Sequence, residues 1–367
     1  MTGPRTRPAT IYDVAERAGV SKSLVSLVLR DSPRVSDARR EAVVRAMAEL
    51  DYRPSTAAVS LAGTRTRTIG VVLDDFRNQW FVDILTGLRE SLEGQGLRLV
   101  VADRFLNTGL DATPIEGFLS MRVEGIVIAG EPDPDHVVPS HTPVVVAGGR
   151  ARVEGADTIA NDDHAGGRLA TEHLLALGHR RIGHVTTTGS RAALERRAGF
   201  DAALAAAPAT DLPGPATDPP APAADLPAPA THLRSPVADL RSPTIALDGP
   251  MTEATGAAAA ARLLAEHPDV TAIFAANDVM ALGALSVLAE RGLRVPDDVS
   301  VVGYDDTPFA AARFIDLTSV DDRSTDIGRA AGATLLARIA DHTREPTETL
   351  VAPTLVVRGS TAPPRAD

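Results

Sequence analysis

The stretch TIYDVAERAGVSKSLVSLVLR, residues 10–30, predicts two short helices joined by a tight turn. Thr10 and Asp13 have the spacing of a capping box, which begins a helix, and Gly19 suits the left-handed conformation that ends one. Ser21 can cap a second helix only a few residues after the first one stops. Two short helices across a glycine-containing turn form the helix-turn-helix pattern.

The second of these helices has one apolar side and one polar side. Val25, Val28 and Leu29 recur at i, i+3 and i+4, so we expect them to pack on the neighbouring helices. The other side holds Lys22, Ser23, Ser26 and Arg30. The helix therefore has a face that is free to contact a partner.

A third helix is expected from Ser36, because apolar residues recur there near the 3.6-residue period. These residues are Ala38, Val43, Ala46, Met47 and Leu50. Three such apolar stripes can close a small core. The N-terminal part of the chain is thus expected to be a small all-α domain.

This N-terminal part also differs in charge from the rest of the chain. Residues 1–68 contain 12 Arg and Lys and 7 Asp and Glu, a balance of +5, whereas the whole chain carries −11 and the other 299 residues therefore −16. A basic head suits contact with nucleic acid, because neutralising phosphates releases condensed counterions. Arginine clusters are also common on solvated surfaces, so charge alone leaves both interpretations open.

The segment after Tyr52, RPSTAAVSLAG, predicts one further short helix. Pro54 suits its start and Gly63 its end. The helix between them has about eight residues, fewer than the roughly 12–15 at which an isolated helix becomes even marginally stable. We expect it to be disordered unless something docks it.

From Ile69 onward, apolar runs alternate with amphipathic stretches. The runs TIGVVLDD, LRLVVAD, VEGIVIAG, TPVVVAGG, RRIGHVTTT, VTAIFAAND and DVSVVGYDD are typical of buried parallel strands. The helices expected between them are FVDILTGLRESLEGQG, AGGRLATEHLLALG, TEATGAAAAARLLAEHP and VMALGALSVLAERG. This alternation predicts an α/β core with helices on both faces of parallel sheets, and its length predicts two doubly wound subdomains.

Residues 207–243 interrupt this pattern. From Asp211 the chain repeats in sevens as DLPGPAT, DPPAPAA, DLPAPAT, HLRSPVA and DLRSPTI. A proline in every repeat excludes a coiled coil, and Pro-Ala-rich sequence with few large apolar groups is typical of a semi-extended, disordered segment. The insertion is either an expanded surface loop or a partner-binding linker.

Several classes of protein are disfavoured by composition. The chain has no cysteine, its nine histidines show no HExxH spacing, and we expect no metal or cofactor. No apolar run approaches a membrane span, and no apolar region follows the arginines at the start, so we expect a cytoplasmic protein without membrane contact. No G-x-S-x-G, P-loop or G-x-G-x-x-G motif indicates an enzyme.

The chain resembles the LacI/GalR family of transcription regulators over nearly its whole length, except about residues 207–243. The motifs TIYDVAERAGVS, RPS…LAG, LGHRRI, RRAGF, AANDVMALGAL and VPDDVSVVGYDD lie in the family's order and spacing. The resemblance implies a helix-turn-helix DNA-binding domain at 9–54, a hinge helix at 55–63, and a dimerising, effector-binding core at 68–358. That core would be like a periplasmic sugar-binding protein.

The resemblance also implies which residues contact DNA. They are Thr10, Ser21, Lys22, Ser23, Ser26, Leu27, Arg30, Ser55, Ala58 and Leu61. Leu27 stands where the family commonly has arginine, and Arg30 where it commonly has asparagine, so we expect Leu27 to face DNA and the operator half-site to differ there. Lys22, the only lysine, is either an ordinary exposed residue or a base or phosphate contact. Leu61 would wedge into the minor groove at the operator centre.

In the core, the resemblance implies that an effector is held by Asn78, Trp80, Phe81, Arg196, Asp278 and Asp322. An arginine fork donates to hydroxyl or ring oxygens, and a carboxylate accepts from hydroxyls. Arg196 and Asp278 could instead be surface ion-pair members, and Phe81 a core residue. Gly148 and Gly149 stand where relatives often have an acid, and Asp322 where they often have glutamine.

The implied function is a homodimeric repressor that binds double-stranded DNA at a palindromic operator. A small-molecule effector, a sugar, would bind between the core subdomains and modulate operator affinity as inducer or corepressor. Two alternatives stay open: a DNA-binding regulator that has lost its ligand response, and a cytoplasmic sugar-binding protein.

Overall fold

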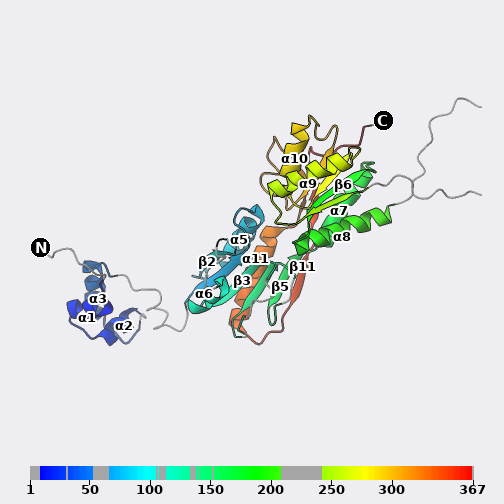
Figure 1. Ribbon diagram of the computed structural model, residues 1–367. Coiled ribbons are helices and arrows are strands. Elements are labelled where there is room, and N and C mark those ends of the chain that lie inside the picture. Colours follow the sequence, from blue (N-terminus) through cyan, green and yellow to red (C-terminus); the bar gives the residue numbers. More distant parts are fainter. Residues whose placement is uncertain are drawn as a thin grey trace, which may run out of the picture.

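The computed structural model describes residues 9–29, 32–52, 66–104, 106, 113–132, 138–139, 141–150, 153–207 and 242–365 (Figure 1). The predicted hinge helix at 55–63 lies outside these residues. So does the predicted insertion at 207–243, apart from its two ends.

The N-terminal unit is a three-helix domain, as predicted. Its helices are α1 (Ile11–Ala18), α2 (Lys22–Leu29) and α3 (Asp37–Glu49). Val14, Val25 and Val43 are fully buried at its centre. Ala38 is exposed, so its assignment to the apolar stripe of α3 was wrong. It stands five residues before the buried Val43, and at 3.6 residues per turn this spacing places the two on different sides of the helix.

The predicted signals that start and end the first two helices are confirmed. The Thr10 hydroxyl accepts from the backbone N–H of Asp13, whose side chain accepts from the backbone N–H of Thr10. Gly19 ends α1 with φ 63°, a conformation that costs glycine little. Ser21 caps α2 by accepting from the backbone N–H of Leu24 at 3.2 Å.

The first core subdomain is built on a six-stranded parallel sheet in the order β11-β5-β4-β3-β1-β2. Its strands are β1 (Thr68–Leu73), β2 (Arg98–Asp103), β3 (Gly125–Gly130), β4 (Val144–Gly148), β5 (Asp157–Asn161) and β11 (Glu348–Val351). Its helices are α5 (Gln79–Leu92), α6 (Pro114–Ser120) and α11 (Ser324–Ala340). The sheet and α5 and α11 enclose an apolar core around Ile84 and Val127.

The second subdomain has a six-stranded sheet in the order β12-β10-β9-β8-β6-β7, parallel except for the edge pair β10–β12. Its strands are β6 (Ile182–Thr187), β7 (Thr244–Leu247), β8 (Ala272–Ala275), β9 (Ser300–Tyr304), β10 (Thr318–Asp321) and β12 (Thr354–Val356). Its helices are α7 (Asp163–Ala176), α8 (Arg191–Ala206), α9 (Glu253–Glu266) and α10 (Asp278–Glu290). The predicted fold class, an all-α domain with two parallel-sheet α/β subdomains, is confirmed.

The chain passes between the two subdomains three times (Figure 1). It crosses between β5 and α7, between β10 and α11, and between β11 and β12. The carboxyl ends of parallel strands are where α/β proteins bind ligands. Side chains at these crossings and strand ends are therefore placed between the subdomains.

Candidate functional site

The predicted polar face of α2 is accessible. Lys22 and Ser23 are exposed and Ser26 is half-buried, whereas Val25 and Val28 are buried against the other helices. Leu27 is half-buried like Ser26 and packs on the edge of the three-helix core, so that its contact with DNA stays a prediction. Arg30, Ser55, Ala58 and Leu61 lie outside the described residues.

Lys22 is held by a residue that sequence reasoning did not identify. Its Nζ donates to the Tyr12 hydroxyl at 3.1 Å and lies 4.7 Å from the centre of the Tyr12 ring. Tyr12 is 64% exposed on α1. The two side chains form one exposed cation–aromatic unit across the helix pair.

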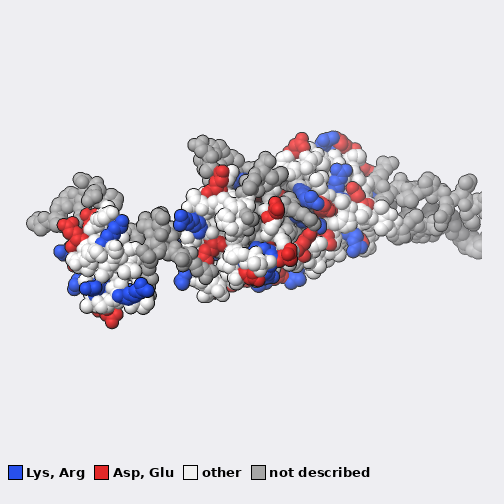
Figure 2. All heavy atoms as spheres, turned by 90° about the horizontal axis from the view of Figure 1, so that it is seen from below, with Lys and Arg blue, Asp and Glu red and all other residues white. Residues whose placement is uncertain are grey.

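Charged residues are distributed over this domain and the core. On the face drawn in Figure 2, the helical domain carries several Lys and Arg side chains with fewer acids, and the core shows both signs interspersed. Thr10 and Ser21 use their hydroxyls as helix caps, so they also have a structural role. Exposed basic side chains are the groups that can neutralise the phosphates of a nucleic acid.

A cavity of about 170 Å³ lies between the two core subdomains. The first subdomain contributes Asp74, Asn78, Trp80, Phe81, Arg104, Gly130, Glu131 and Gly148. The rest of the wall is Asn161, Gly189, Ser190, Ala192, Arg196, Met251 and Asp305. Asn78, Trp80, Phe81 and Arg196 are thus brought together as predicted, although Asn78 also caps α5 by accepting from the backbone N–H of Trp80.

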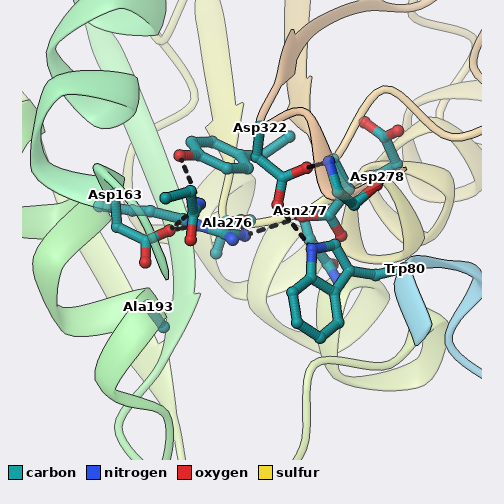
Figure 3. A network of polar contacts seen from close by, with 12 residues as sticks. Trp80, Asp163, Ala193, Ala276, Asn277, Asp278 and Asp322 are labelled. Atoms are coloured by element: carbon teal, nitrogen blue, oxygen red, sulfur yellow. Dashed lines mark hydrogen bonds and ion pairs between the residues drawn. The ribbon is translucent and has the colours of Figure 1, made fainter. Parts of the chain in front are cut away.

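Arg196 is the centre of a buried polar network. Figure 3 labels its partners Asp163 and Ala276. Arg196 is 4% exposed, and its guanidinium donates from Nε to Asp163 Oδ1 at 2.7 Å and from Nη1 to the carbonyl of Ala276 at 2.6 Å. Nη1 also lies 3.3 Å from Asp305 Oδ1, and the group stacks on the Tyr304 ring at 3.6 Å. The alternative of a surface ion pair is wrong, because this pairing is buried.

Trp80 connects the two subdomains. Its indole Nε1 donates to Asp322 Oδ2 at 2.6 Å, and Figure 3 shows the two side chains pointing toward one another. Asp322 lies at the crossing between β10 and α11 and also accepts from the backbone N–H of Ser324. It is fully buried and does not line the cavity, which corrects its prediction as a ligand contact. A Cβ on Gly148 would come within 2.2 Å of the Trp80 ring. Glycine at 148 therefore makes room for the tryptophan.

Asp278 does not line the cavity, which corrects the prediction. Its carboxylate is fully buried and accepts from the Ser319 hydroxyl and from the backbone and hydroxyl of Thr307. Asp305, which follows β9, lines the cavity in its place. Both residues follow an apolar strand, so the sequence pattern could not separate them.

Burial shifts the pKa of several acids in and around the cavity upward, because desolvation disfavours their charged forms. The pKa of Asp322 is raised to about 7 and that of Asp74 to about 6. Burial also raises the pKa of Asp305 well above its usual value, although Arg196 opposes this. Of these acids, Asp74 and Asp305 line the cavity, whereas Asp322 lies behind its wall, bonded to Trp80.

The titration of Asp322 is expected to be visible in the fluorescence of Trp80, the only tryptophan. Protonation weakens the carboxylate as an acceptor for the indole N–H, so the emission should change with a midpoint near pH 7. Because the folded pKa exceeds the usual 3.8, Asp322 should also make folding less favourable as pH rises from about 4 through 7.

The control for this titration is Asp322→Asn, which keeps one acceptor oxygen but cannot titrate. Its emission should stay constant between pH 6 and 8. A transition of unchanged size in the variant would show that another group is responsible.

No cluster of His, Cys, Asp and Glu among the described residues could hold a metal ion. No described helix is both long and apolar enough to cross a membrane.

Comparisons with known proteins match both parts of the chain. Residues 10–55 match the description "Bacterial regulatory proteins, lacI family". Residues 66–220 match "Periplasmic binding proteins and sugar binding domain of LacI family", and residues 171–361 match "Periplasmic binding protein-like domain". The predicted likeness of the core to periplasmic binding proteins is confirmed.

Individual relatives extend over almost the whole chain. The transcriptional regulator CelR of Thermobifida fusca is 33% identical over an alignment of 371 residues, which covers 97% of this chain and 99% of CelR. The structure of a CelR–cellobiose complex has a TM-score of 0.62, with 32% identity over 96% of this chain and 99% of that one. The lac repressor dimer bound to operator and the anti-inducer ONPF has a TM-score of 0.70 at 27% identity, covering 97% of this chain and 100% of that one.

The family that these matches indicate consists of DNA-binding regulators rather than enzymes. The helix-turn-helix domain and the two-subdomain core with its cavity fit that description. The match to CelR exceeds 30% identity and spans nearly both chains. The protein therefore belongs to the LacI family of bacterial transcriptional regulators.

Proposed function

We propose that the protein is a homodimeric repressor that binds a palindromic operator and is controlled by a small ligand of the sugar class. It would act in the cytoplasm. The observation that carries this proposal is the cavity between the subdomains, whose wall combines Trp80 and Phe81 with Arg196 and Asp305. Aromatic faces and convergent polar groups are what a sugar ring with several hydroxyls requires.

The cavity can couple ligand binding to the arrangement of the core. A ligand there contacts Asn78 and Trp80 from one subdomain and Ser190 and Arg196 from the other. It therefore favours whichever relative orientation gives it the better contacts, and it can shift the equilibrium only by that difference in affinity. The same coupling free energy would change ligand affinity when operator is bound.

The relatives support both halves of the proposal. CelR has been solved with cellobiose, and the lac repressor as a dimer on its operator. We retain the division into a DNA-binding domain at 9–54, a hinge helix at 55–63 and a core at 68–358. We assign ligand contact to Asp305 in place of Asp278, because only Asp305 lines the cavity.

On the DNA side, we propose that the exposed Lys22 and Ser23 reach the major groove. Thr10, Ser21, Ser26 and Leu27 would support them at its edges. Arg30, Ser55, Ala58 and Leu61 stay predicted contacts, with Leu61 as the minor-groove wedge.

The test is selection of bound DNA from a random pool, followed by a screen of sugars for an effect on binding to the recovered site. We expect a palindromic site, and a sugar that changes its affinity by at least tenfold. Recovery of no preferred site would contradict DNA-binding control. A preferred site together with no sugar that alters binding or the melting temperature would favour the alternative of a regulator without ligand response.

Leu27 is expected to help set the operator sequence. Replacing it by arginine introduces a side chain that can donate two hydrogen bonds to guanine O6 and N7, a pairing worth about 1–3 kcal/mol of discrimination. Selection with Leu27→Arg should therefore change base preference at one symmetric pair of positions. An unchanged preference would contradict a role for Leu27 in DNA reading.

Tyr12 is expected to position Lys22 for that contact. Tyr12→Phe removes the hydroxyl acceptor but keeps the ring, whereas Tyr12→Leu removes both. We expect operator affinity to fall about fivefold in the first and further in the second, at roughly 1 kcal/mol for each lost interaction. Neither change should matter in a Lys22→Met background; equal losses there would mean that Tyr12 acts on DNA independently of Lys22.

A further inference from the structure

We propose that the effector of this cavity is a single-ring sugar that carries a protonated amine. The inference rests on the proposed function and narrows its ligand from sugars in general to amino sugars. It comes from the juxtaposition of several carboxyl groups with two arginines that are already engaged by the protein itself.

The charges around the cavity do not balance. Asp74, Glu131 and Asp305 line it, together with Arg104 and Arg196. Two further carboxyl groups lie directly behind this wall: Asp163 is bonded to Arg196, and Asp322 is bonded to Trp80. Glu131 has further polar contacts of its own, so it is left out of the balance. Among the other described residues, four carboxyl groups surround two guanidinium groups.

Both guanidinium groups have protein partners. Arg104 pairs with Asp74 at 2.8 Å. Arg196 binds Asp163 and the carbonyl of Ala276 and has its face covered by Tyr304. The positive charge of Arg196 is shared by Asp163 and Asp305, and that of Arg104 is paired with Asp74, so neither charge is left uncompensated for an anionic ligand. The cavity is therefore unsuited to acidic sugars or phosphates, although Nη2 of Arg196 can still donate to a neutral oxygen.

Asp305 is the acceptor most available to a ligand. Its side chain is buried and lines the cavity, yet within the described part of the chain its carboxylate has only the 3.3 Å approach of Arg196 and no hydrogen bond. A ligand that fills the cavity removes water from this group. An ammonium group brings three donors and a positive charge to replace that water, whereas a hydroxyl brings one donor and no charge.

The aromatic wall favours the same chemistry. Trp80 and Phe81, from the first subdomain, meet edge to face with ring centres 4.9 Å apart, and both line the cavity together with Arg196 from the second subdomain. Aromatic faces attract cations as well as sugar C–H groups. A ring bearing an amine can therefore satisfy the aromatic and the acidic walls together.

The size of the cavity limits the ligand to one ring. Its volume of about 170 Å³ is below the roughly 300–1,000 Å³ of pockets that hold drug-sized ligands. The Trp80 ring occupies the space beside Gly148 and contributes to this restriction. A disaccharide would need the ring to move.

Protonation of the acids fits this picture. Burial raises the pKa of Asp74, Asp305 and Asp322, so at a given pH a larger fraction of these groups is protonated and neutral than in exposed carboxyl groups. An ammonium group beside them lowers their pKa values and makes them ionise. A bound amine therefore favours the charged forms of these acids.

The test uses matched pairs of single-ring sugars on the full-length protein: glucosamine with glucose, galactosamine with galactose, and mannosamine with mannose. Binding is followed by the fluorescence of Trp80 and by the melting temperature. We expect at least one amino sugar to bind at least tenfold more tightly than its hydroxyl counterpart. Its neutral N-acetyl derivative should lose this advantage.

The variant Asp305→Asn should reduce the preference for the amine at least fivefold. Asp306→Asn is the matched control, because Asp306 pairs with Arg358 and does not line the cavity. If Asp305→Asn does not fold, Glu131→Gln serves instead, since Glu131 also lines the cavity and is only partly buried.

Two results would overturn the inference. One is a neutral sugar that binds as tightly as its amino counterpart, which would leave the proposed function standing with a neutral effector. The other is failure of every amino sugar to bind. In that case the wider sugar screen on the operator complex decides the proposed function separately.

Discussion

Replacing Arg196 by methionine is expected to lower the free energy of unfolding by about 3–5 kcal/mol, the cost of removing one partner from a buried ion pair. The guanidinium is 4% exposed and lies between Asp163 and Asp305. Methionine fills part of the volume but leaves both carboxyl groups buried without a cation. The carbonyl of Ala276 loses its side-chain donor as well.

Urea unfolding measures this effect, and the neighbouring residue provides the control. Arg197 is 44% exposed at its side chain and lies 3.7 Å from Asp201, an exposed pair on the same helix. Arg197→Met should cost less than 1 kcal/mol, because exposed ion pairs contribute little. Similar losses in the two variants would mean that the buried network does not depend on the charge of Arg196.

A second variant separates charge from packing. Asp163→Asn in the Arg196→Met background removes one of the uncompensated acids, and it should recover part of the lost stability. The single variant Asp163→Asn should be less destabilising than Arg196→Met, because Arg196 keeps Asp305 as a partner. Additive losses in the double variant would contradict the coupling between these side chains.

The core elements that could be predicted from sequence are those with long apolar runs. Strands β1 and β9 are buried along their whole length or nearly so, and the pattern identifies them. The edge strand β11 has three exposed residues among its four, and β12 has no buried one. Such strands are held by pairing with a neighbour that is distant in sequence, so their own residues carry no apolar signal.

The cavity shows a similar division. Both Arg196, which lies in the motif RRAGF, and Trp80 were identified from the resemblance to the family. Asp163 and Tyr304 fix the orientation of Arg196. Asp163 lies 33 residues before Arg196 and Tyr304 lies in β9, so no local sequence pattern relates them to it. Only the fold brings these side chains together.

Gly148 illustrates why a departure from a family pattern needs its surroundings. By itself it predicts a missing acceptor in the cavity. In the structure, the Trp80 ring lies where a side chain at 148 would begin, and residue 148 has φ 85°, which favours glycine. The tryptophan at 80 thus requires the glycine at 148, and its indole N–H is satisfied by Asp322.

Replacing Phe314 by aspartate is expected to convert the proposed homodimer to a monomer and to lower operator affinity at least 100-fold. Phe314 is 88% exposed, the most exposed of the large apolar side chains in the described part of the chain. It borders an open groove of about 580 Å³ whose apolar wall includes Leu282, Leu285 and Leu293. Exposed apolar surface of this kind marks a protein interface, and we propose a second copy of the chain as its occupant.

The loss of affinity follows from the symmetry of the operator. A dimer places two helix-turn-helix domains on two half-sites, whereas a monomer binds one half-site without the contribution of its partner. Because the exposed Phe314 side chain contributes little to the packing of the subunit's core, its replacement should change the melting temperature of the isolated subunit little. Sedimentation velocity gives the oligomeric state, and titration of the operator recovered by selection gives the affinity.

Leu194→Asp is the control for this substitution. Leu194 is 50% exposed on α8 and does not border the groove, so its replacement should leave both the dimer and operator binding intact. A Phe314→Asp protein that still sediments as a dimer would show that the groove is not the dimer interface. A monomer that binds the operator as tightly as the original protein would show that dimerisation does not contribute to DNA affinity.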